Sequence, residues 1–103
     1  MQIIENINEI NNIENKLIAI RIYADWCNLC KKMLPRILTL EKEFSDVKFI
    51  SVEIGQVPEI VKYFNVGSLP MFVLLKDGTE VERINGMALI GPMRKVFREL
   101  LAS

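Results

Sequence analysis

Apolar residues gather in three short runs along the chain, and these runs predict β-strands. They lie at positions 17–23, 47–54 and 71–75. The first two are apolar on both faces, which is typical of interior strands of a sheet that is covered from both sides. Arg21 is the one charged residue of the first run, and an unpaired buried charge is costly. We therefore expect Arg21 to have a partner or to reach the strand end near the cysteines.

A turn signal separates the third run from a more polar segment, and together they predict a β-hairpin. The turn is Lys76-Asp77-Gly78-Thr79, and the segment after it covers positions 80–85. Val81 and Ile84 have opposite parity within that segment. Since strict alternation fails there, we expect an edge strand or a bulge.

Between these runs, apolar residues recur at helical spacing. The four segments start near Ile7, after Cys30, at Pro58 and at Gly91. The first stripe is Ile7, Ile10, Ile13 and Leu17, and the last is Met93, Val96, Phe97, Leu100 and Leu101. Pro35 lies inside the second helix, where a missing hydrogen bond predicts a bend. With a short strand at 2–4, the order is βαβαβα followed by a hairpin and a helix, which indicates an α/β fold with right-handed crossovers.

Composition narrows the class of protein. The 103 residues are half apolar and one quarter charged, which suits one globular domain over 1–103. Thirteen basic residues balance thirteen acidic ones, so no broad charge favours nucleic acid or an anionic membrane surface. No apolar run has transmembrane length, and Glu5 and Glu9 stand where a signal peptide would be basic and then apolar. We expect a cytoplasmic, reducing location.

The only two cysteines, Cys27 and Cys30, lie where the first strand gives way to a helix. At a helix start this spacing places both sulfurs on one face of the first turn, close enough for a small disulfide. The free N–H groups and the helix dipole stabilise a thiolate on the first sulfur. We therefore predict that Cys27 attacks and that Cys30 resolves.

Two other interpretations of the cysteine pair stay open. It is half of a metal site, or it is a pair of small buried apolar residues. A tetrahedral zinc site needs four ligands, and the chain has no histidine and no further cysteine. A cluster bridged between two chains by paired Cys-x-x-Cys motifs is a related possibility. We expect no metal and no bound cofactor.

Trp26-Cys27-Asn28-Leu29-Cys30-Lys31, the internal Pro35, Leu69-Pro70, the turn at 76–78 and Gly86 together resemble thioredoxin over almost the whole chain. The resemblance implies the thioredoxin fold, with a central mixed sheet of about four to five strands flanked by about four helices. It also implies a monomeric thiol–disulfide oxidoreductase with a redox-active centre, which serves electron transport and cell redox homeostasis. Its expected partners are protein disulfides and a reductase such as thioredoxin reductase.

The resemblance also assigns roles to residues outside the cysteine pair. Pro70 would be the family's cis-proline beside the dithiol. Trp26, Leu69, Gly86 and Met87 would line an apolar groove that binds extended substrate segments through backbone hydrogen bonds.

Three departures from the family affect how the site is tuned. Asn28-Leu29 replaces the usual Gly-Pro between the cysteines, Arg21 stands where the family buries an aspartate, and Ser51 replaces the lysine that faces it. We hypothesise that Arg21 favours the thiolate and makes the protein a better oxidant than a typical thioredoxin. The opposing interpretation is that Arg21 points away and pairs with a carboxylate such as Glu53. A non-catalytic interaction module with an altered site is the alternative function.

Overall fold

Five strands form one mixed sheet at the centre of the computed structural model, which describes residues 1–103. The strands are β1 (Gln2–Ile3), β2 (Leu17–Tyr23), β3 (Lys48–Glu53), β4 (Met71–Lys76) and β5 (Thr79–Asn85). Their spatial order is β1-β3-β2-β4-β5, so β2 occupies the middle position, as its apolar run predicted. It pairs with β3 in parallel and with β4 in antiparallel orientation.

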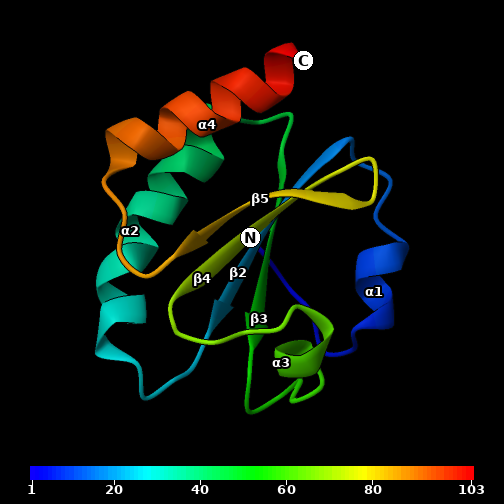
Figure 1. Cartoon of the computed structure of the whole chain (residues 1–103), viewed down its shortest axis with the longest axis vertical. Helices are drawn as coiled ribbons and strands as arrows, with labels where there is room; N and C mark the ends of the chain where they lie inside the picture. The colour runs from blue at the N-terminus through cyan, green and yellow to red at the C-terminus, as the bar shows by residue number, and fades with distance from the viewer.

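Four helices cover the two faces of the sheet. They are α1 (Asn8–Asn11), α2 (Asn28–Glu43), α3 (Ile60–Tyr63) and α4 (Ile90–Ala102). Figure 1 shows α2 and α4 packed together on one side, whereas α1 and α3 lie on the other side. The fold class that we expected is therefore confirmed, with five strands and four helices.

Each face of the sheet has its own hydrophobic core. The cluster under α1 and α3 contains 13 buried residues, among them Ile20, Ile22 and Ile50 from the two central strands. The cluster under α2 and α4 contains 11, including Phe49, Phe72 and Phe97. The ring centroids of Phe72 and Phe97 are 6.0 Å apart. Because residues alternate between faces along a strand, both cores need apolar side chains from the same runs.

The hairpin has the geometry that its sequence predicted. Asp77 and Gly78 both have positive φ, at 51° and 83°, as a tight two-residue turn between twisted strands requires. The register between β4 and β5 shifts between Leu74 and Leu75, where Val81 is the extra residue on β5. The predicted bulge is therefore present, and β5 is an edge strand as well.

The helix predictions were wrong in three details. The first stripe does not continue to Leu17, because α1 ends at Asn11 and Leu17 starts β2, opposite Lys76 of β4. The asparagine-rich segment has low helix propensity, and Leu17 buries its apolar side chain by pairing in the sheet instead. Helix α3 begins at Ile60 rather than at Pro58, and Leu101 at the end of α4 is exposed rather than buried. Pro35 lies within α2, which continues from Asn28 to Glu43.

Candidate active site

The site is built where the middle strand β2 ends and helix α2 begins. The backbone N–H of Cys27 donates to the carbonyl of Ala24 at 3.1 Å, which closes a turn between strand and helix. Cys27 then caps the helix from an extended conformation, with φ −86° and ψ 106°. The site therefore lies at the carboxyl end of a central strand, where α/β sheets commonly hold their ligands.

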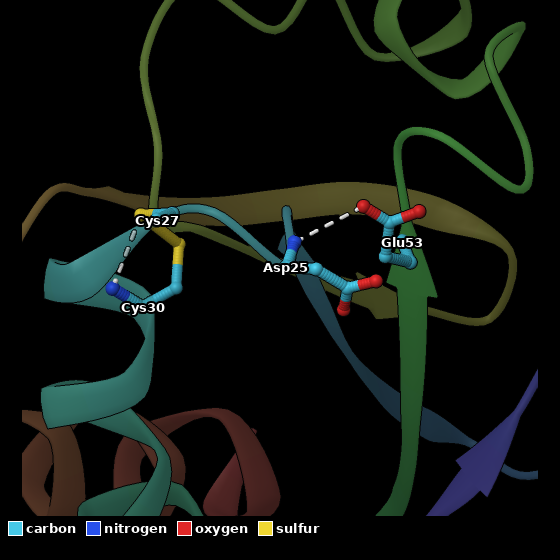
Figure 2. Close-up of a disulfide and its surroundings, with 4 residues drawn as sticks. All are labelled: Asp25, Cys27, Cys30 and Glu53. Atoms are coloured by element: carbon cyan, nitrogen blue, oxygen red, sulfur yellow. Dashed lines mark hydrogen bonds between the residues drawn. A yellow bond between two sulfur atoms is a disulfide. The ribbon is translucent and has the colours of Figure 1, made fainter.

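The two cysteines form a disulfide across the first turn of α2, with their Cα atoms 5.3 Å apart (Figure 2). The backbone N–H of Cys30 donates to the Sγ atom of Cys27 at 3.2 Å. This N–H is one of the donors that the start of a helix leaves without a partner inside the helix. A negative charge on the Cys27 sulfur would therefore meet both this donor and the positive end of the helix dipole.

The two sulfurs differ in access to solvent. Cys27 keeps 7% of its surface exposed, whereas Cys30 keeps none. Trp26, directly before the pair, is 73% exposed. An incoming molecule can thus reach the site beside Cys27 and not beside Cys30.

An apolar cavity of about 480 Å³ opens beside Cys27. Trp26, Asn28, Leu29 and Leu69 line it, together with residues that the sequence did not single out: Ile54, Val61, Val66, Gly67 and Ser68. These come from the end of β3, from α3 and from the loop before Pro70. Sequence patterns miss them because they belong to separate segments that only the fold brings together.

The loop before β4 completes one wall of the cavity. The peptide bond between Leu69 and Pro70 is cis, the isomer that the resemblance implied. The carbonyl of Pro70 accepts a hydrogen bond from the N–H of Gly86 at 2.8 Å, so Gly86 lies directly beside it. Met87 is exposed, and neither Gly86 nor Met87 lines the cavity, although the resemblance implied that they would.

Glu53 holds the loop that leads into the cysteines, a role that the sequence analysis did not identify. Its Oε2 accepts the backbone N–H of Asp25 at 3.2 Å, and its Oε1 accepts that of Gln56 at 2.9 Å. Figure 2 shows the Asp25 carboxylate pointing away from the disulfide while its backbone faces Glu53. The available signal was position, since Glu53 ends the strand next to β2, at the same edge of the sheet.

Arg21 lies next to Ser51 on the neighbouring strand, as the alignment with the family implied. Its guanidinium is 3.7 Å from the centre of the Tyr23 ring, and its Nη1 donates to the Ser51 hydroxyl at 3.5 Å. The ion pair with Glu53 that the opposing interpretation proposed is not formed, and Glu53 binds the two backbone N–H groups instead. Burial lowers the pKa of Arg21 below its usual value, against the opposing effects of Tyr23 and Asp25.

No group of three or more His, Cys, Asp or Glu side chains is arranged to hold a metal ion. No helix is both long and apolar enough to cross a membrane. What the structure does present is an α/β domain whose Cys-x-x-Cys disulfide caps a helix beside an apolar cavity, which is the arrangement of a dithiol redox protein.

Comparison with known proteins places the chain within a family. The sequence model described as Thioredoxin matches residues 4–97. The chain is 40% identical over 79 residues to thioredoxin H2 of Arabidopsis thaliana, covering 77% of this chain and 59% of that protein. It is 36% identical over 83 residues to mitochondrial thioredoxin-3 of Saccharomyces cerevisiae, covering 79% and 65%. The chain belongs to the thioredoxin family.

Solved structures agree with this assignment. The oxidised form of mitochondrial thioredoxin 3 from Saccharomyces cerevisiae superposes with a TM-score of 0.88 at 32% identity. That match covers 96% of this chain and 94% of the yeast chain. The matched region is, however, less than two thirds of the length of the two relatives named above, at 59% and 65%.

Proposed function

We propose that the protein is a thiol–disulfide oxidoreductase of the thioredoxin type, which exchanges two electrons with protein disulfides through a reversible Cys27–Cys30 disulfide. The observation that carries this proposal is the asymmetry of the pair. Cys27 reaches the surface beside an apolar cavity and accepts an N–H bond at a helix start, while Cys30 is fully buried next to it. This is what a nucleophile and a resolving group require.

The reaction follows from these positions. In the reduced protein, the Cys27 thiolate attacks one sulfur of the substrate disulfide, whose S–S bond breaks as a mixed disulfide forms. The released substrate sulfur takes a proton from solvent. Cys30 then loses its proton and attacks the Cys27 sulfur, which releases the second substrate thiol and closes the Cys27–Cys30 disulfide. Two electrons pass from the protein to the substrate, and the reverse sequence oxidises a substrate dithiol.

The cavity beside Cys27 is the proposed substrate site. Trp26 and Leu69 supply apolar surface for a substrate segment, and Asn28 and Leu29 line the same cavity. Pro70 and Gly86, which share a backbone hydrogen bond, and Met87 do not line the cavity, and we assign them to its outer rim. An extended segment that lies here binds through its backbone, so recognition depends little on its sequence.

The remaining assignments follow from family membership. The disulfide is the only redox group required, so no separate cofactor takes part. A reductase such as thioredoxin reductase returns the oxidised protein to the dithiol. One relative's structure was solved in work on the thiol resolving mechanism of a yeast mitochondrial 1-Cys peroxiredoxin, which makes peroxiredoxins a reasonable substrate class to test. We propose that the protein acts as a monomer in the cytoplasm.

Reduction of insulin disulfides by dithiothreitol tests the proposal. The wild-type protein should accelerate the reaction, and Cys27→Ser should abolish the acceleration. Cys30→Ser should retain the attack but accumulate a mixed disulfide, which is visible on a non-reducing gel. Lys32→Gln, an exposed change on α2, serves as the control that keeps full activity. A wild-type protein without activity would instead support the non-catalytic interaction module.

A further inference from the structure

Arg21 is a buried cation without an anionic partner. Only 6% of its surface is exposed, yet no carboxylate oxygen lies within 4.0 Å of its nitrogens. Its one hydrogen bond to another side chain is the long contact to Ser51 at 3.5 Å. A guanidinium has five N–H donors. No fully buried side-chain nitrogen lacks a hydrogen-bond partner, so the donors of Arg21 that have no acceptor in the protein are those that still reach solvent. The Tyr23 ring, 3.7 Å from the guanidinium, compensates for part of its lost hydration, and no anion compensates for the rest.

Arg21 and Ser51 both line a cavity of about 460 Å³ that is separate from the one beside Cys27. Asp25 and Lys31 belong to this second cavity, while Trp26 and Cys27 belong to the first. The two cavities therefore lie on either side of the loop that enters α2. Arg21, whose donors without a protein acceptor reach solvent, thus borders a space of ligand size.

The other residues that line this cavity indicate which kind of ligand it can bind. Ile3, Leu34 and Leu38 make much of the wall apolar. Lys31 adds a second positive charge, and the Asp25 carboxylate in the same wall offsets it, so the charge of Arg21 is the one left to balance. A ligand with two negative charges would place only one of them against Arg21 and leave the other without a buried cation. One negative group on an apolar body matches one buried guanidinium in an apolar cavity.

We propose that this cavity binds a small organic carboxylate, with the carboxylate against Arg21 and Ser51 and the apolar body against Ile3, Leu34 and Leu38. The site does not depend on the proposed redox function, because none of these residues takes part in the exchange steps. The planar fork of Arg21 matches the two oxygens of a carboxylate, and the Ser51 hydroxyl supplies one further donor.

Titration of ¹⁵N-labelled oxidised protein with 2-naphthoate tests the proposal, with neutral 2-naphthamide as the matched probe. Naphthoate should bind at least about tenfold more tightly than naphthamide, since only the carboxylate meets Arg21 with opposite charge. Amide shifts should gather at Ile3, Leu38 and Ser51 and leave Leu69 unchanged. Arg21→Met should reduce naphthoate affinity to that of the amide, and Ser51→Ala should weaken it to a smaller extent.

Lys32→Met is the control, because this exposed residue of α2 does not line the cavity. The proposal is overturned if the two probes bind equally to the wild-type protein, or if Arg21→Met binds naphthoate as well as wild type does. It is also overturned if naphthoate shifts only residues around Trp26 and Leu69. If Arg21→Met fails to fold, the comparison of probes on the wild type and on Ser51→Ala still decides the question.

Discussion

Glu53 gives the sharpest test of how the fold positions the cysteines. Substitution by alanine removes the acceptor for two backbone N–H groups, those of Asp25 and Gln56, at 3.2 and 2.9 Å. Hydrogen bonds to a charged group contribute about 1.5–3 kcal/mol each. Both N–H groups lie near the surface, where water replaces part of the loss, so we take the lower end of that range. Glu53→Ala should lower the free energy of unfolding by about 3 kcal/mol.

Glu53→Gln refines the same prediction. Its amide keeps one acceptor oxygen but turns an NH₂ group towards the other backbone donor, so about half of the loss should remain. Urea unfolding of the oxidised protein measures both changes, with Glu99→Gln as a control on the exposed side of α4. Because the loop before Cys27 is released, insulin reduction by both Glu53 variants should also fall. If Glu53→Ala unfolds within about 0.5 kcal/mol of wild type, Glu53 does not hold this loop.

Three further outcomes are expected. Phe97→Ala should lower the free energy of unfolding by about 3–5 kcal/mol in urea, since Phe97 is fully buried among the rings under α2 and α4; a loss below 1.5 kcal/mol would contradict this. Arg21→Asp should lower the reduction potential measured against glutathione if Arg21 stabilises the thiolate, and an unchanged potential removes that hypothesis. Hydrogen bonding to Arg94 lowers the pKa of Glu43 below 4.5, so this pair stabilises the fold above that pH and its contribution fades as the folded carboxylate takes up a proton. Arg94→Met should therefore flatten the acid limb of a pH–stability curve, and an unaltered limb would show that the exposed pair contributes nothing.

Local patterns were enough for the strands, the hairpin and the cysteine turn, because each depends on residues that are close in sequence. The apolar run at 17–23 placed β2 in the interior, and the mismatched parity of Val81 and Ile84 located the bulge. The contacts of Glu53 and Arg21 were beyond such patterns. Which of two nearby groups a buried carboxylate binds depends on distances between separate segments, and here backbone N–H groups took the place of the guanidinium.

The same limit applies to the cavity beside Cys27. Val61 and Val66 line it from the short α3 and the loop that follows, and neither carries a pattern that distinguishes a lining residue from a core residue. Val61 and Val66 reach the cavity because the connection from β3 to β4 passes beside the cysteines. Family resemblance located Leu69 and Pro70 because their roles are tied to a recognisable motif.

The borders of the sheet also bear on how the protein behaves when it is abundant. At one border β1 contributes only two residues, and at the other β5 carries a bulge and the charges of Glu80, Glu82 and Arg83. A short strand, an irregular ladder and charged side chains on an edge strand each make a poor template for pairing with a strand from another chain. Edge-to-edge association of protein copies is thus disfavoured at both borders. At high protein concentration the cavity beside Cys27 therefore stays accessible to substrate chains.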